Sequence, residues 1–261
     1  MDKRILYFDC SSGISGDMCV SALIDLGADF NGIKAGLKKL PLEGYTLGIS
    51  KEKRHGITGT RFKVKTLEHG HGRGFSDIKK LIEKSALAQG IKKLSIKIFE
   101  NLAIAEAKVH GTAKEDVHFH EVGAIDSIMD IVGSAIALDM LCVDRIYSSA
   151  LPLGSGFVNS SHGIMPAPAP ATVELLKDVS VTNSMVQAEV TTPTGAAILK
   201  TIASSFGGLP AMTIKGAGYG IGTMDFKEIP NVLRVIMGEA TAQSEQVLML
   251  ETNIDDSNPQ V

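Results

Sequence analysis

The sequence predicts an α/β fold in which helices pack on a mixed sheet around one central apolar helix. Residues 4–8 are apolar and lead through a tight Gly/Ser loop into an amphipathic helix over 17–27, an opening typical of α/β proteins. Alternating runs at 45–50 and 59–66 predict two paired strands, so the sheet is not purely parallel. Residues 122–142 are apolar nearly all round, which places that helix at the centre of the fold.

The remaining elements follow from periodicity and from turn residues. Gly27 ends the first helix, and two further helices are expected over 75–88 and 92–110, with Gly111 as the stop of the second. The second half predicts, in order, a strand 144–149, a loop of Gly, Ser and Pro over 152–170, a helix beginning near Ala171, a helix 194–206, and strands 212–221 and 231–237.

The chain divides into an N-terminal domain, 1–240, and the start of a second one. Residues 241–246 lie in the polar run ATAQSEQ and predict a linker. Residues 247–261 begin a new strand pattern that stops midway, as expected for a truncated C-terminal domain. We therefore expect a fragment, or one part of a split protein.

Composition narrows the class of protein. No apolar stretch is long enough to cross a bilayer, and no signal peptide is recognisable. The three cysteines, an odd number, favour reduced thiols and a cytoplasmic location over a disulfide framework. The net charge is −3 and the chain has no block of Lys or Arg, so the sequence does not predict a basic surface that would bind nucleic acid or an anionic membrane. We therefore expect a small-molecule partner.

A metal site is the first chemical candidate. His118 and His120 point the same way in an extended segment, so both imidazoles can reach one metal ion. Imidazole ligands suit borderline metals such as nickel and zinc. Asp126 and Asp130 follow one helical turn apart on an otherwise apolar helix, where an ionised carboxylate is costly unless a cation or donors compensate. Glu121 would lie about 140° from Asp126 around that helix. Not all five side chains can bind the same ion.

An alternative interpretation needs no metal. Asp126 then bonds to neighbouring backbone or to an arginine such as Arg61, and the two histidines belong to a solvated turn. We favour the metal, although clustered ionisable groups mark functional sites only statistically. His69, His71 and His110 could add ligands, but a surface loop and an ordinary helix end explain them as well.

An anion site is the second candidate. The Gly/Ser loop after the first strand enters a helix, and such loops present N–H groups to phosphate at the carboxyl end of a strand. Its glycines would let the backbone approach the anion, but their GxxG spacing is not a Walker or dinucleotide motif. Asp9 and Asp17 could hold a metal that bridges to phosphate, and Asp17 could equally be a helix cap. The candidate ligand-binding residues here are Ser11, Ser12, Gly13, Ser15, Gly16 and Asp17.

A third group lies further along the chain. Residues 191–195 enter a helix, so their hydroxyl and N–H groups could receive an anion, while a plain N-cap is the favoured alternative. The evenly spaced glycines of 216–222 are interpreted as bends in a strand. The candidates in this group are Thr191, Thr192, Thr194 and Gly195, with Ser155, Asn159, Ser160, His162 and Glu189 nearby in sequence.

Several long blocks resemble one family. They are FDCSSGISGDM, HFHEVGAIDSIMDIVG, the segment from His162 through PAPAPAT, EVTTPTGAAIL, GYGIGTMDF with PNVLRV, and ETNIDD. In this order, and over essentially the whole chain, they resemble the LarC-type nickel-insertion proteins. The resemblance implies a nickel chelatase, a lyase of metal-cofactor maturation. Its members place nickel into pyridinium-3,5-bisthiocarboxylic acid mononucleotide, with CTP consumed, to give the nickel-pincer nucleotide cofactor of lactate racemase.

The resemblance also implies partners and a division of labour. CTP with Mg or Mn would bind in the C-terminal domain, and the product would pass to apo lactate racemase or other nickel-pincer enzymes, with a homo-oligomer possible. In some members the two parts come from two reading frames joined during translation, and this chain would be the N-terminal one. Some relatives carry a long His-rich loop where this chain has only His69 and His71.

The residue patterns and the family resemblance together give one set of candidate site residues. His118, His120, Asp126, Asp130 and Asp9 are the candidate metal ligands. Insertion must break a pyridinium C–H bond and therefore needs a base, for which Glu121 and His162 are the candidates. The alternatives are a non-catalytic nickel-delivery module and a divalent-metal phosphohydrolase.

Overall fold

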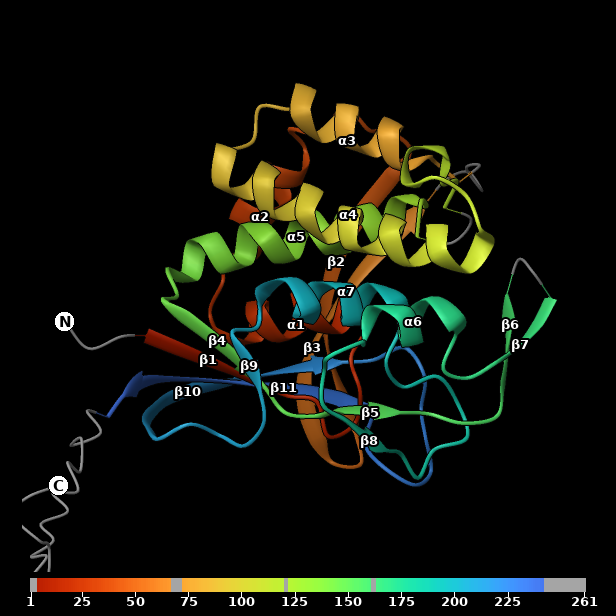
Figure 1. The fold of residues 1–261 in the computed structure, drawn as a ribbon. Coiled ribbons are helices and arrows are strands. Elements are labelled where there is room, and N and C mark those ends of the chain that lie inside the picture. The colour runs from red at the N-terminus through yellow and green to blue at the C-terminus, as the bar shows by residue number, and fades with distance from the viewer. Residues whose placement is uncertain (1–3, 67–71, 120–121, 161–162, 242–261) are drawn as a thin grey trace, which may run out of the picture.

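A seven-stranded mixed sheet forms the base of the molecule, as the sequence predicts (Figure 1). The computed structural model describes residues 4–66, 72–119, 122–160 and 163–241. The strand order is β2-β3-β10-β11-β1-β4-β9, and β1 runs parallel to β4 but antiparallel to β11. The strands are β1 (Arg4–Asp9), β2 (Tyr45–Arg54), β3 (Ile57–Thr66), β4 (Arg145–Ser148), β9 (Ser205–Phe206), β10 (Met212–Ile221) and β11 (Val232–Ala240).

The helices stack in layers on one side of this sheet. Figure 1 shows α1 and α7 next to the strands, α5 above them, and α3 and α4 farthest away. Within the described ranges, no helix is both long and apolar enough to cross a membrane. The helices are α1 (Gly16–Leu26), α2 (Phe30–Leu37), α3 (Phe75–Lys84), α4 (Gln89–His110), α5 (Ile125–Leu141), α6 (Pro170–Leu175) and α7 (Pro193–Ile202), with a 3-10 turn η1 (Lys114–Asp116).

Helix α5 is the central apolar helix that the sequence predicts near 122–142. It contacts α1, α2, α4 and α7. Nearly every residue from Ile128 to Leu138 is buried, because neighbours cover the helix on several sides. The polar residues of this stretch are the buried Ser134 and the half-buried Asp130, while Asp126 in the first turn is exposed.

Helix α1 packs directly on β10 because that strand lacks side chains where the helix crosses. A Cβ on Gly218 would lie 2.2 Å from the carbonyl oxygen of Ala22, and one on Gly220 would lie 2.1 Å from that of Met18. Both glycines therefore serve close packing, a role that their interpretation as bends did not include. The strand has one irregularity, a register shift between Ile214 and Gly216.

The sequence missed short elements. Helix α2 was not predicted, although Asp29 caps it by accepting bonds from Asn31 N at 3.2 Å and Gly32 N at 2.8 Å. The predicted loop 152–170 is wrong, because it contains two short strands that pair with each other and most of a third that pairs with residues 181–183, and the helix predicted over 194–206 ends at Ile202. These strands are β5 (Leu151–Leu153), which pairs with β8 (Val181–Asn183), and β6 (Phe157–Ser160), which pairs with β7 (Gly163–Pro166).

The helix crossing over β10 yields a stability prediction. Gly220→Ala should lower the free energy of unfolding by about 2–3 kcal/mol, because the new methyl group overlaps the backbone of α1. Gly48→Ala on β2 is the matched control, since a Cβ there meets no atom within 4 Å, and it should change stability by less than about 1 kcal/mol. Urea unfolding followed by circular dichroism measures both, and equal effects would show that the crossing tolerates a side chain.

Candidate functional site

Two loops that are far apart in the sequence lie side by side beyond the carboxyl end of β1. The Ile14 N–H donates to the carbonyl of Val190 at 2.9 Å, and the Thr192 N–H donates to the carbonyl of Ile14 at 3.0 Å. The resulting parallel bridge joins residues 11–17 to residues 191–195. The structure therefore brings together the two segments that the sequence suggested, separately, for a phosphorylated ligand.

Glycines in both segments are required by this junction. Gly13 has a φ of +94°, and a Cβ there would lie 2.0 Å from the carbonyl oxygen of Val190. A Cβ on Gly195 would lie 2.4 Å from the carbonyl oxygen of Ile14. The expectation that Gly13 leaves room for an anion needs correction, because protein already fills the side where its side chain would stand.

The hydroxyl groups of the second segment are mostly engaged within the fold. Thr191 is buried and donates to the carbonyl of Pro152 at 2.8 Å. Thr192 is the N-cap of α7 and accepts from Gly195 N at 3.2 Å, which confirms the N-cap alternative for this residue. Thr194 is buried beside Gly16.

The N-terminus of α1 has no side-chain cap. Ser15 occupies the N-cap position, but its hydroxyl donates to the Asp17 carboxylate and accepts no hydrogen bond from the N–H groups of the first turn. Asp17 lies in the first turn, where it accepts from Met18 N at 2.9 Å and from the Thr223 hydroxyl at 3.3 Å. Asp17 is therefore not the N-cap residue, although its carboxylate accepts from one N–H group of the first turn. Earlier in the same loop Ser11 is exposed and donates to Asp9, while Ser12 is buried.

A hollow of about 180 Å³ opens beside this uncapped helix end. Its volume is below the roughly 300 Å³ at which whole-ligand pockets begin, so it can hold only part of a nucleotide. The sequence did not suggest Thr223 or Asn231 as lining residues, and the one signal was their place in two blocks of the family resemblance, GYGIGTMDF and PNVLRV. Asn231 also holds that segment in place through a bond from Nδ2 to the Met224 carbonyl at 2.9 Å. The hollow is lined by Ser15, Asp17, Met18, Glu189, Val190, Thr192, Thr223, Met224, Phe226 and Asn231.

Asp130 lies against the start of α1. A Cβ added to Gly16 would be 2.7 Å from Asp130 Oδ2, so the carboxyl group touches the helix backbone. The residue as a whole is only half-buried, but its Oδ1 atom is buried and has no hydrogen-bond partner within the described residues. Burial, together with the negative charges of Asp17 and Asp126, raises the pKa of Asp130 well above its ordinary value. The position suits a cation or a neutral acid and disfavours a free carboxylate.

The segment before α5 is fixed by its apolar residues. Phe75 N donates to the Val117 carbonyl at 3.1 Å and Phe119 N to the Arg73 carbonyl at 3.2 Å, so residues 117–119 pair with 73–75. Val117 and Phe119 are buried, and His118 between them is exposed. Candidate residues that lie outside the described residues are His120, Glu121 and His162, together with His69 and His71.

Asp9 has partners of its own. One carboxylate oxygen accepts from Ser11, and the other forms an ion pair with Arg234, which lies opposite on β11. Burial raises the pKa of Asp9, but the hydrogen bonds from Ser11 and Arg234 outweigh it and hold the pKa below its ordinary value. A metal at Asp9 would have to compete with Arg234.

The remaining alternatives can be compared with the geometry. Asp126 is exposed and accepts from Ser127 N at 2.9 Å, in line with the backbone alternative. Arg61 pairs with Glu52 at 3.2 Å, so the alternative that used Arg61 is wrong. Over residues 4–66, 72–119, 122–160 and 163–241, no three His, Cys, Asp or Glu side chains gather as a metal-binding group.

Comparison with known proteins gives a consistent family. A family model described as nickel insertion protein matches residues 6–261. The chain is 50% identical over 262 residues to a "Putative nickel insertion protein" of Geobacter metallireducens, covering 99% of this chain and 67% of the relative. It is 48% identical over 258 residues to the "Pyridinium-3,5-bisthiocarboxylic acid mononucleotide nickel insertion protein" of Staphylococcus epidermidis, covering 98% and 65%. No solved structure matches.

The buried carboxyl of Asp130 yields a prediction for stability against pH. Its raised pKa means that the folded state binds this proton more tightly than the unfolded state. That contribution to the free energy of unfolding is present at low pH and is lost as the pH rises from about 4, where an unfolded aspartate titrates. Asp130→Asn should therefore be stabilised relative to the parent chain, increasingly so toward pH 8.

Urea unfolding with EDTA between pH 4 and 8 measures this difference. The control is Asp139→Asn, an exposed aspartate on the same helix, whose curve should follow the parent. A constant difference between Asp130→Asn and the parent at every pH would contradict the assignment.

Proposed function

The chain belongs to the nickel insertion protein family, and we propose that it inserts nickel into pyridinium-3,5-bisthiocarboxylic acid mononucleotide. The printed name of the Staphylococcus epidermidis relative supports this substrate. The family resemblance supports the finer proposals, which are a chelatase of the lyase class, consumption of CTP, and a nickel-pincer nucleotide as the cofactor of lactate racemase. Nickel is a substrate of this reaction.

The observation that carries the proposal is the environment of Asp130. A buried carboxyl oxygen without a donor costs several kcal/mol when it is ionised, and Asp17 and Asp126 add negative charge. A divalent cation at this point would remove both penalties. We propose that nickel binds here through Asp130 with Asp126, and that His118 and His120 supply the nitrogen ligands that nickel prefers.

The nucleotide end of the substrate fits the neighbouring hollow. The uncapped start of α1 and the first turn of α7 both border it, and helix N-termini attract phosphate. Asp17 and Glu189 line the same space and would repel an anion unless a cation lies between them. Metal and phosphorylated ligand would therefore bind together more tightly than either alone.

The chemical step needs a proton acceptor. Nickel replaces hydrogen on a pyridinium carbon, so one C–H bond breaks, one C–Ni bond forms and one proton leaves. We keep Glu121 and His162 as the proposed bases, because each is an ionisable residue in a block that carries the family resemblance.

The remaining proposals concern partners and organisation. We propose Mg or Mn with CTP, transfer of the product to apo lactate racemase or another nickel-pincer enzyme, a homo-oligomer, and a cytoplasmic location. We also propose the division into a domain 1–240, a linker 241–246 and a second domain from 247. The chain spans about two thirds of the length of the relatives that it matches.

Replacing the buried carboxyl tests the metal site. Asp130→Asn should weaken nickel binding at least tenfold in calorimetry, because the amide removes the negative charge beside the cation. It should also lower formation of the nickel–carbon product, followed by mass spectrometry in the presence of nickel, CTP and the thiolated precursor. Asp139→Asn on the same helix should leave both unchanged.

The outcomes separate three functions. Full nickel affinity in Asp130→Asn would remove the carboxyl from the site. Nickel binding with no product under complete conditions would favour a delivery module, and phosphate release without nickel would favour a phosphohydrolase.

Replacing both histidines tests the second half of the ligand set. His118→Ala combined with His120→Ala should lower the nickel stoichiometry without changing the melting temperature, because His118 is exposed and makes no core contact. His110→Ala is the control, since that imidazole contacts Glu106 at 3.2 Å at the end of α4. Unchanged stoichiometry with a normal melting curve would show that neither imidazole binds the metal.

A further inference from the structure

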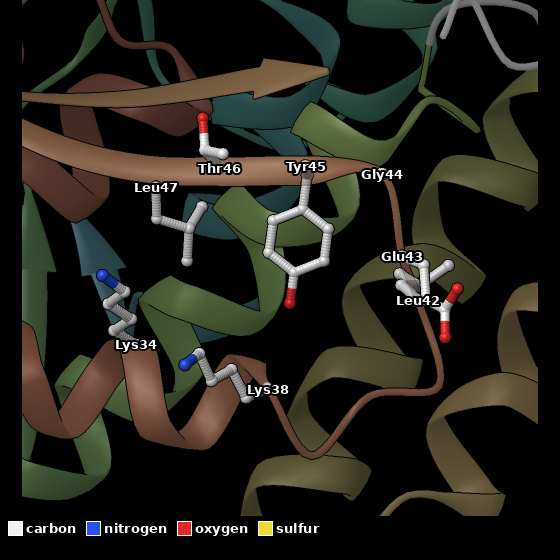
Figure 2. Close-up of a pocket in the computed structure, with 8 residues that line it drawn as sticks. All are labelled: Lys34, Lys38, Leu42, Glu43, Gly44, Tyr45, Thr46 and Leu47. Carbon is white, nitrogen blue, oxygen red and sulfur yellow. The ribbon is translucent and has the colours of Figure 1, made fainter. Parts of the chain in front are cut away.

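A second hollow, of about 390 Å³, lies between α2 and the start of β2. Figure 2 shows Lys34 and Lys38 on the helix with their amino groups directed toward the strand, where Tyr45 and Leu47 point back at the helix. Leu42 completes the apolar part of the lining. None of these residues belongs to the site beside Asp130.

Strand β2 is an edge of the sheet. Its neighbour in the strand order is β3, and in the described part of the chain no strand pairs with its other side. The first six residues of the strand, 45–50, carry no charge, and the Ile49 side chain is 44% exposed. A long edge of this kind can accept a further strand through its backbone N–H and C=O groups.

Positive charge lines this edge on the helix side. Lys34 and Lys38 have no carboxylate partner among the residues that the structure describes, and Glu43 points away from them in Figure 2. Lys53 lies on the same face of the strand as Leu47, since side chains alternate along a strand. Lysines on an edge strand discourage aggregation, but that explanation does not cover Lys34 and Lys38, which lie on α2.

We propose that the free edge of β2 receives an extended, acidic segment of a partner protein. The segment adds a strand to the sheet, with aliphatic side chains beside Leu47 and Ile49 and acidic side chains facing the lysines at each end. Backbone pairing gives affinity, and the charges select the partner.

A second copy of this chain does not meet the charge requirement. If two β2 edges paired antiparallel about Ile49, Lys53 of each copy would lie opposite Tyr45 of the other, beside its Lys34 and Lys38. Like charges in register destabilise strand pairing. The partner is therefore acidic where this chain is basic.

The test uses a labelled peptide, Glu-Thr-Val-Thr-Val-Thr-Val-Thr-Glu, whose length matches residues 45–53, and fluorescence anisotropy. The peptide reads the same in both directions, so its charges meet the lysines in parallel or antiparallel pairing. It should bind the full chain, whereas the same peptide with Lys in place of Glu should not. Lys34→Glu with Lys38→Glu should weaken binding at least tenfold, because it reverses the charge at the hollow.

Two controls make the result specific. Lys80→Glu with Lys84→Glu changes two lysines of the same spacing on α3, which are exposed, and should leave binding unchanged. Hydrogen exchange should show that the peptide protects backbone amides of residues 45–53. Binding without that protection, or equal loss in both double variants, would overturn strand addition. Protection of the same amides by self-association, without peptide, would assign the edge to a second copy instead.

Discussion

The arrangement of the site depends on how closely α1 approaches its neighbours. Beneath it, Gly218 and Gly220 let the helix rest on the backbone of β10. At its N-terminus, Gly16 touches the carboxyl group of Asp130 on α5. Ser21 links α1 to β3 by hydrogen bonds, since its hydroxyl donates to the Asp17 carbonyl and accepts from Phe62 N at 2.8 Å. Because these contacts involve backbone, α1 cannot shift without disturbing the sheet, the central helix and the site together.

The candidate site combines groups that attract an anion with groups that repel one. Two helix N-termini favour an anion, whereas Asp17 and Asp130 disfavour one. Under the proposed function, this arrangement would become favourable when a cation and a phosphorylated ligand bind together. A nickel-inserting protein needs this property, because it must bring a metal and a nucleotide into contact and then release their product.

Long periodic segments made most of the fold predictable. The central helix, the β2–β3 hairpin and strands β1, β10 and β11 follow from apolar periodicity over six or more residues. Helix α2 did not, because its sequence FNGIKAGL has two glycines and only eight residues. The strands of β5 to β8 have three or four residues each, too few to show alternation.

The site was predictable in its parts but not in its assembly. The residue spacing identified Asp130 as an acidic residue on an apolar helix. The Gly, Ser and Thr residues before two predicted helices identified the loops 11–17 and 191–195. The sequence could not show that Gly13 and Gly195 face protein, since that depends on a contact between the loops. Thr223 and Asn231 were missed because single hydroxyl and amide residues in the connection between β10 and β11 carry no periodic signal.

The bridge between Ile14 and the strand before α7 also bears on the order of folding. Gly13 fits against Val190, and Gly195 fits against Ile14, so each loop holds the shape of the other. Most of the chain lies between them, and closing so long a loop carries an entropic cost that local elements do not share. We therefore expect the two loops to meet after α1, α5 and the hairpin have formed. If the proposed site is correct, a nascent chain would expose scattered histidines and aspartates, and it would bind the metal only when synthesis and folding of this region are complete.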